Sequence, residues 1–214
     1  MDNGAFELGK SYDAGRLLEL GQKCKADAIV LPDFPGKPCK KTIDASEAIV
    51  DSIKAAGFRT MFVPQSERGN MADWIAGYQY AATNDDIDII GMSILGIPNA
   101  IPVIDRSFCR VAMSLLLIQQ GIFNFDKHHH YLGLNGGPGL EIPSLLRLGA
   151  LDTCDSSNPI WTGILGHEYT YNADSLSSVK KPKILVDFDL PYIDDSETHR
   201  RIQTNIDMTL ELFK

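Results

Sequence analysis

Short, continuous runs of apolar residues recur along the chain, and a stretch with helical spacing of apolar residues separates most runs from the next. Such runs, rich in Ile, Val and Leu, are typical of strands covered on both faces. Parallel strands need long crossover connections, which the intervening helical stretches supply. We therefore predict strands over residues 28–31, 60–63, 87–94, 131–134 and 151–154, with helices over residues 13–25, 44–56, 71–83, 106–120 and 140–148.

This alternation predicts an α/β fold, either a (β/α)8 TIM-type barrel or an open doubly wound sheet. We favour the barrel, because several strands end in a polar or glycine-rich tip and a ring of such tips is expected at a barrel mouth. The tips are Asp33, Gln65, Gly91 to Ser93, Gly133 and Asp155. With a further short strand expected within residues 2–8, about six core strands are visible, so the barrel is expected to be incomplete at its N-terminus.

The length of 214 residues is most simply one domain. We expect residues 1–166 to form the barrel core. Residues 167–214 are expected to form a C-terminal excursion with a strand over residues 183–188 and a helix over residues 197–213.

Composition narrows the functional classes. The net charge of −8 argues against a broadly basic nucleic-acid surface, although lysine and arginine pairs leave room for a local patch. No apolar run is long enough for a membrane span, and no signal peptide is visible at the N-terminus. The four cysteines are scattered without close pairs, as expected of a reduced cytoplasmic protein.

Asp155 is the residue that we expect to carry chemistry, because it stands at a strand tip where barrel enzymes place reacting groups. An aspartate there is also a common helix N-cap, and Ser156 and Ser157 fit that alternative. Asp33 between prolines has the alternative of an ordinary turn residue, and Asp2 that of a frayed terminus. We interpret residues 128–130, three consecutive histidines, as surface residues, because they cannot all face one metal ion.

Several of these segments, taken in order, resemble the tRNA-guanine transglycosylase superfamily. The matching motifs are Asp2-Asn3-Gly4-Ala5-Phe6-Glu7, Ile29 to Asp33, Phe62 to Gln65, Gly91 to Gly96, His130 to Gly133 and Asp152 to Asp155. The closer resemblance is to the DNA-modifying branch of phages and bacteria, which exchanges guanine for a 7-deazaguanine. The resemblance covers residues 2 to about 166 and implies a (β/α)8 barrel.

The resemblance also implies residue roles. Asp155 would be the nucleophile that attacks the anomeric carbon of the target nucleotide, which suits an ionised carboxylate, and Asp2 the second catalytic aspartate, which handles the proton of the base. Asp33 would read the guanine edge, since a carboxylate accepts two adjacent hydrogen bonds. The remaining base-binding positions that it implies are Phe6, Gln65, Gly91, Met92, Tyr131 and Gly133.

The implied activity is that of a pentosyltransferase that exchanges guanine in a nucleic acid through a covalent aspartyl intermediate. The zinc-binding cysteines of the tRNA-acting members have no counterpart after Cys154, so we expect no metal and no cofactor. The implied partners are DNA rather than tRNA, a 7-deazaguanine base, and a second copy or another chain that completes the barrel. Two alternatives remain: a non-catalytic or truncated barrel that binds guanine or a nucleotide, and an unrelated barrel enzyme.

Overall fold

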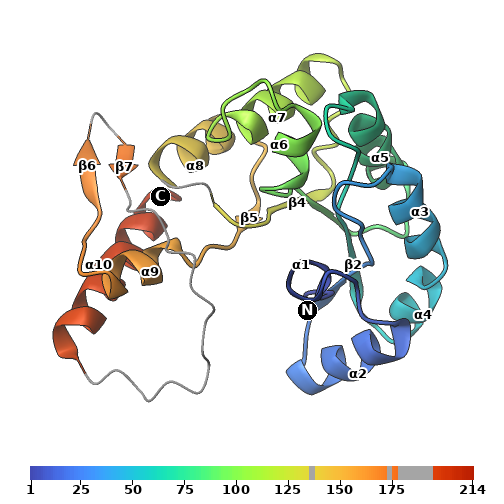
Figure 1. Ribbon diagram of the computed structural model, residues 1–214, viewed down its shortest axis with the longest axis horizontal. Helices are drawn as coiled ribbons and strands as arrows, with labels where there is room; N and C mark the ends of the chain where they lie inside the picture. The colour runs from blue at the N-terminus through green and yellow to red at the C-terminus, as the bar shows by residue number, and fades with distance from the viewer. Residues whose placement is uncertain (135–137, 173–174, 178–194) are drawn as a thin grey trace.

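Five short parallel strands pair side by side in chain order and form one curved sheet in the computed structural model of the chain (Figure 1). The structure describes residues 1–134, 138–172, 175–177 and 195–214. The strands are β1 (Ala28–Val30), β2 (Arg59–Phe62), β3 (Ile89–Gly91), β4 (His128–Tyr131) and β5 (Thr153–Cys154). The sheet curls into a half-barrel, so the predicted α/β class with parallel strands is confirmed, in a form consistent with an incomplete barrel.

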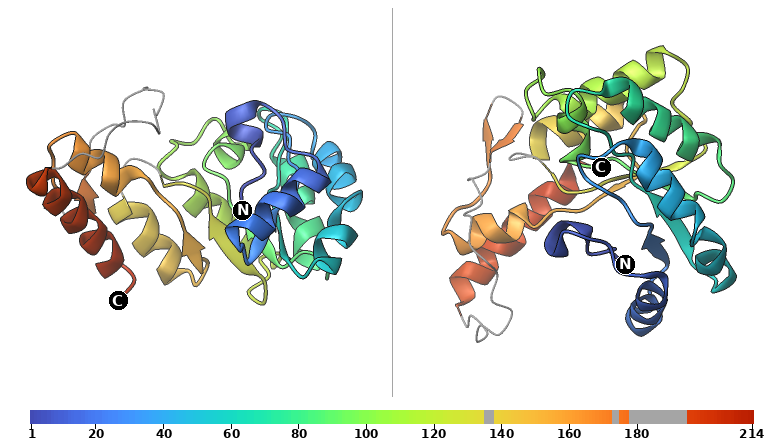
Figure 2. Two further views of the ribbon diagram at one scale, coloured as in Figure 1. Left: turned by 90° about the horizontal axis from the view of Figure 1, so that it is seen from below. Right: turned by 45° about the vertical axis from the view of Figure 1, so that its right-hand side comes forward.

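Helices cover the convex face of the sheet and leave the concave face towards the N-terminal α1 (Figures 1 and 2). The connecting helices are α2 (Ala14–Cys24), α3 (Cys39–Glu47), α4 (Val50–Ala55), α5 (Met71–Thr83), α6 (Gly96–Ala100), α7 (Cys109–Gln119) and α8 (Pro138–Arg147), and α1 spans Ala5–Leu8. The main core lies between the sheet and these helices, with Phe62 and Ile90 of the strands and Trp74 of α5 fully buried. A smaller apolar cluster, made of Val30, Met61, Val63 and Ile89, lines the concave face.

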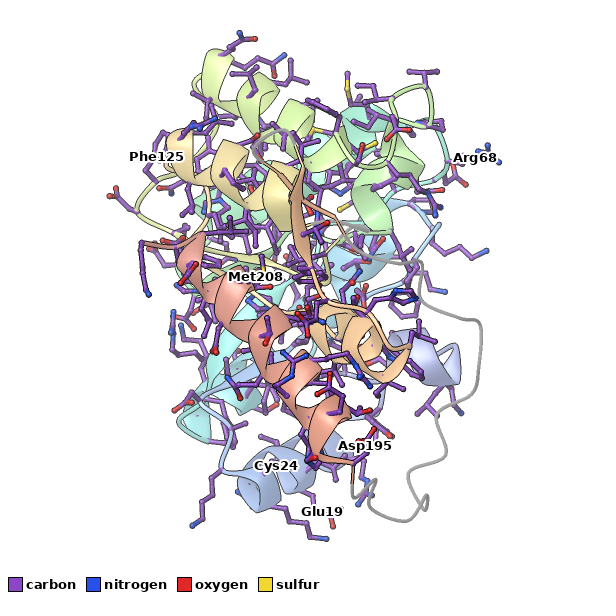
Figure 3. All side chains as sticks on the ribbon, turned by 90° about the vertical axis from the view of Figure 1, so that its left-hand side faces the viewer. Glu19, Cys24, Arg68, Phe125, Asp195 and Met208 are labelled. Carbon is purple, nitrogen blue, oxygen red and sulfur yellow. The ribbon has the colours of Figure 1, made fainter. Side chains whose placement is uncertain are left out.

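The C-terminal part packs beside the β5 end of the sheet. It contains α9 (Asn158–Ile164), the antiparallel hairpin of β6 (Thr170–Asn172) and β7 (Ser175–Ser177), and α10 (Ser196–Glu211), which lies against α9 (Figure 3). The predicted C-terminal helix over residues 197–213 is thus confirmed with slightly different bounds. The strand predicted over residues 183–188 lies outside the described residues.

Two predicted elements differ in kind from the observed ones. The single helix over residues 44–56 is two helices, α3 and α4, separated at Ala48 and Ile49. The short strand expected within residues 2–8 is replaced by the one-turn helix α1, and only Met1 pairs with β1: its ammonium donates to the Ala28 carbonyl (2.7 Å), and its carbonyl accepts from the Val30 amide (3.0 Å). These two bonds have the pattern of a parallel pair, so Met1 stands where a strand preceding β1 would lie.

The three histidines of residues 128–130 lie in strand β4, between β3 and β5, rather than in a surface loop, which corrects the sequence interpretation. Histidines can form this inner strand because the backbone pairs with β3 and β5 whatever the side chains are. Each imidazole ring also has a hydrogen-bond partner. His129 faces the core, where its Nε2 lies 2.8 Å from the Tyr78 hydroxyl. His128 and His130 face the concave side, and both rings contact the Thr153 hydroxyl, at 2.7 and 2.8 Å.

Candidate functional site

The carboxyl ends of the strands meet at one rim of the half-barrel, as parallel topology requires. Asp33 follows β1, Gln65 follows β2, Ser93 follows β3, Gly133 follows β4 and Asp155 follows β5. The segment after Met1 supplies a sixth tip, Asp2 and Asn3. All of these residues line one pocket with a volume of about 410 Å³, which we call the Asp pocket.

The Asp pocket has an apolar floor and acidic walls. Val30, Val63, Ile94 and Leu132 contribute apolar surface to it. Three carboxylates line it, from Asp2, Asp33 and Asp155. No lysine or arginine is among its lining residues in the described part of the chain, so these polar groups favour a ligand that donates hydrogen bonds or carries positive charge.

Asp33 is held in place by two neighbouring amides. Its Oδ1 accepts from Asn3 Nδ2 (2.8 Å), and its Oδ2 accepts from Gln65 Nε2 (2.6 Å). Asn3 also donates to the Leu31 carbonyl (2.7 Å) and accepts from the Ala5 amide, which fastens the N-terminal segment to the end of β1. Asp33 is therefore not an ordinary turn residue, because it is 8% exposed and bonded on both oxygens.

Asp155 is anchored through its Oδ1 oxygen. The Gly133 amide donates to it at 2.9 Å, and His130 Nε2 lies 3.3 Å away. Gly133 has φ of +66°, a conformation that glycine adopts without strain, and this turn aims its amide at the carboxylate. The N-cap alternative is excluded for Asp155, since Ser157 occupies the N-cap position of α9 and Ser156 Oγ accepts from the Asn158 amide.

The surroundings of Asp33 and Asp155 shift the pKa values of these two aspartates in opposite directions. Burial raises the pKa of Asp33, the negative charge of Asp2 adds to this, and the hydrogen bonds from Asn3 and Gln65 partly offset it. Partial burial of Asp155 also disfavours its charged form, but the hydrogen bonds from His130 and Gly133 outweigh this and leave the pKa of Asp155 below its ordinary value. Asp155 thus holds a negative charge more readily than Asp33 does.

Not every predicted site residue faces the pocket. Asp2, Asp33, Gln65, Gly133 and Asp155 come together there. Met92 and Tyr131 instead have fully buried side chains in the main core, and the Tyr131 hydroxyl lies 2.7 Å from Ser114 Oγ. The predicted place of Tyr131 in the pocket wall is corrected, because its side chain projects from the convex face of the sheet. For Met92 the resemblance implies a contact through the backbone, which the burial of its side chain does not test.

The structure gives a different result for the two other predicted base-binding residues, Gly91 and Phe6. A Cβ built at Gly91 would lie 2.8 Å from Val63 Cγ2 and 3.0 Å from Leu132 Cδ1, so the missing side chain makes room for neighbouring apolar groups rather than for a ligand. Gly91 does not line the Asp pocket. Phe6 lies in α1, and its side chain falls outside the described part of the structure.

Three residues that shape the site had no individual role in the sequence analysis, although Ser93 was counted among the strand tips. Asn3 orients Asp33, and Ser93 Oγ accepts from the amides of Leu95 and Gly96 at the start of α6. Arg110, buried in α7, donates to the carbonyls of Met92 and Leu132 and so ties together the ends of β3 and β4. Arg110 was detectable, because it lies on the same helical stripe as Met113 and Leu117, which are buried.

Among the described residues, no group of three or more His, Cys, Asp and Glu side chains is placed to hold a metal ion. None of the helices in that part of the chain has the length and apolar character needed to cross a membrane.

Comparison with known proteins gives little. No family model matches the chain, and no curated protein matches it. Among solved structures, the chain is similar to a mandelate racemase/muconate lactonizing protein from Herpetosiphon aurantiacus, with a TM-score of 0.40 and 15% identity, over 83% of this chain and 44% of that protein. The chain thus spans less than half the length of that protein, and a likeness this weak assigns no activity.

These findings contradict the resemblance drawn from the sequence. No transglycosylase family model and no curated transglycosylase matches the chain. Membership of the tRNA-guanine transglycosylase superfamily and the pentosyltransferase activity inferred from it are therefore withdrawn. The motifs that suggested them are short strand ends, which many α/β proteins share.

Proposed function

We propose that the chain binds a planar nitrogen heterocycle with two adjacent N–H donors, of which guanine is the representative, in the Asp pocket. The observation that carries the proposal is the buried Asp33 carboxylate, fixed by Asn3 and Gln65 at the pocket wall. Each carboxylate oxygen has two lone pairs, so each retains an acceptor site after its bond to the protein. A carboxylate fixed in this way accepts two parallel N–H bonds.

Base chemistry selects guanine among the common nucleobases. Guanine presents its N1–H beside its exocyclic amine, whereas adenine and cytosine present an amine beside a ring acceptor, which a carboxylate repels. Next to Asp33, Gln65 Oε1 is a buried acceptor that has no hydrogen-bond partner among the described residues. The apolar floor formed by Val63 and Leu132 suits the face of a flat ring.

The test is isothermal titration calorimetry with three nucleosides. Guanosine and 7-deazaguanosine, which both keep the two donors, are expected to bind alike. Inosine lacks the exocyclic amine, and we expect it to bind about 10-fold to 100-fold more weakly, because an acceptor in the site then loses its donor. Equal affinity for inosine and guanosine contradicts the assignment of Asp33.

Asp33→Asn is expected to weaken guanosine binding about 100-fold, because the amide turns a donor towards the donors of the ligand. Asp126→Asn is the matched control, since Asp126 is exposed and precedes β4, away from the pocket. The affinities are measured by the same calorimetry, with circular dichroism to verify folding. Unchanged affinity in folded Asp33→Asn refutes the proposal.

We further propose that a second copy of the chain covers the open edge and the concave face of this incomplete barrel. The apolar cluster on the concave face remains partly uncovered at Ala28 and Leu132, and β1 has only Met1 along its outer edge. Sheet edges of this kind are usually paired or covered. Multi-angle light scattering is expected to give a dimer at micromolar concentration, and a stable monomer overturns this proposal.

We also infer a reducing compartment such as the cytoplasm, because all four cysteines are free thiols. Burial raises the pKa of Cys39 and of Cys154 to about 11, which keeps both thiols protonated and poorly reactive.

A further inference from the structure

A second cavity, with a volume of about 390 Å³, adjoins the Asp pocket. The two share Pro35, Gln65 and Leu95 as lining residues. The second cavity is bounded by the loop after β2, by α6 and by the segment that leads into α7. Because the two cavities adjoin at these shared residues, one extended ligand can reach both of them.

The charge of the second cavity is opposite to that of the Asp pocket. Arg68 and Arg106 line it, and no aspartate or glutamate is among its described lining residues; we call it the Arg cavity. Arg68 is exposed, at the edge of the molecule in Figure 3, and forms no ion pair with any residue in the described ranges. Two guanidinium groups in one concave site are the usual protein arrangement for a phosphate or carboxylate.

Gln65 lines both cavities, and its side chain is held in one position. It is 2% exposed, and its bond to Asp33 determines which end of the amide is the oxygen. Oε1 therefore offers a buried acceptor without a partner among the described residues. Gly96 borders this oxygen closely: a Cβ built there would lie 3.1 Å from it, so a side chain at this position would crowd Oε1.

From this we propose that the Arg cavity binds the phosphate group of the same ligand whose base occupies the Asp pocket, so that the natural ligand is a purine nucleoside monophosphate rather than a free base. The inference rests on the proposed function, because it requires the base to bind first in the Asp pocket. The opposite charges of the two cavities fix the orientation: the donor-bearing base lies against the carboxylates and the anionic phosphate against the arginines. The reversed orientation places phosphate beside three aspartates, which like-charge repulsion forbids.

Calorimetry with guanosine, guanosine 5′-monophosphate and inorganic phosphate tests this inference. We expect the monophosphate to bind about tenfold or more tightly than guanosine, because charge-assisted bonds to arginine are added. This preference is expected to shrink as the salt concentration rises, since both arginines are exposed. Inorganic phosphate alone is expected to bind only weakly.

Arg68→Gln and Arg106→Gln are the informative variants. Each is expected to reduce the preference for the monophosphate several-fold while the affinity for guanosine stays unchanged. Arg59→Gln is the matched control, because Arg59 is exposed at the opposite end of β2. Equal binding of guanosine and its monophosphate by the wild-type protein overturns this inference and leaves the proposed function intact. If the wild-type protein binds neither guanosine nor its monophosphate, both the inference and the proposed function are overturned. If the arginine variants lose affinity for guanosine as much as for the monophosphate, the inference alone is overturned.

Discussion

Replacing Glu141 by glutamine is expected to lower the free energy of unfolding by about 3–5 kcal/mol, because it leaves the Arg110 guanidinium buried without its counter-charge. The two side chains form a bidentate pair, with Arg110 Nε to Glu141 Oε1 and Nη2 to Oε2 both at 2.6 Å. Their exposed fractions are 0% and 1%. Solvent cannot screen this pair, so removal of one partner costs the full desolvation of the other.

The pair matters for the site as well as for stability. The remaining nitrogen of Arg110, Nη1, donates to the carbonyls of Met92 (3.1 Å) and Leu132 (3.0 Å), the residues that precede Ser93 and Gly133 in the pocket wall. Glu141→Gln is therefore expected to weaken ligand binding also, since the position of Gly133 sets the bond to Asp155. Arg110 is a positioning residue, which does not line the pocket itself.

Urea denaturation measures the stability effect. Asp44→Asn is the matched control: Asp44 pairs with Lys40 on the surface of α3, where solvent screens the charges, and its midpoint is expected to stay near that of the wild type. The double variant Arg110→Met with Glu141→Leu is expected to recover part of the loss, because no unpaired buried charge remains. A wild-type midpoint for Glu141→Gln contradicts the assigned role of the pair.

The rim of the half-barrel was predictable because parallel topology brings all carboxyl strand ends to one edge. This rule alone places Asp33, Gln65 and Asp155 together, whatever the side chains between them. Asp2 joins them because Met1 pairs in parallel with β1, a contact that no local pattern in the sequence announces. Asn3 was missed for the same reason, since its bonds to Leu31 and Asp33 span long sequence separations.

The side of the sheet to which each strand side chain points was the property that the sequence predicted least well. In a continuous apolar strand both faces are apolar, so periodicity does not tell which residues point to the helices and which to the concave side. The family resemblance placed Met92 and Tyr131 at the pocket, and the apolar pattern of their strands could not show that both side chains face the helices. In β4 the alternation of burial, with His129 and Tyr131 buried and His128 and His130 intermediate, becomes visible only once the strand is known.

Stability is expected to fall as the pH drops from 7 towards 4, because His129 is buried in its neutral form. Burial lowers the pKa of His129 to about 4, while the nearby Asp152 partly opposes this. The Asn124 amide donates to the Tyr78 hydroxyl, which leaves the hydroxyl proton to be donated to His129 Nε2. With the hydroxyl as the donor, His129 accepts at Nε2, which requires the neutral ring.

The sign of the effect follows from linkage. Between about pH 6.5 and 4 the unfolded chain binds a proton at His129 and the folded protein does not, so acid favours unfolding in this window. The full difference in the free energy of unfolding is on the order of 3 kcal/mol. Asp33 acts in the opposite sense, since its raised pKa makes the folded state bind a proton more readily than the unfolded chain does.

A comparison of variants isolates the histidine from the other titrating groups. His129→Gln retains an acceptor near the Tyr78 hydroxyl but does not titrate, so its urea midpoint is expected to fall less between pH 7 and pH 4.5 than that of the wild type. His167→Gln is the control for the substitution itself, because His167 is exposed. Since Asp33 is common to all three proteins, it cancels in the comparison. An identical dependence in His129→Gln, or an NMR titration of His129 near pH 6.5, shows that the ring is not held neutral by burial.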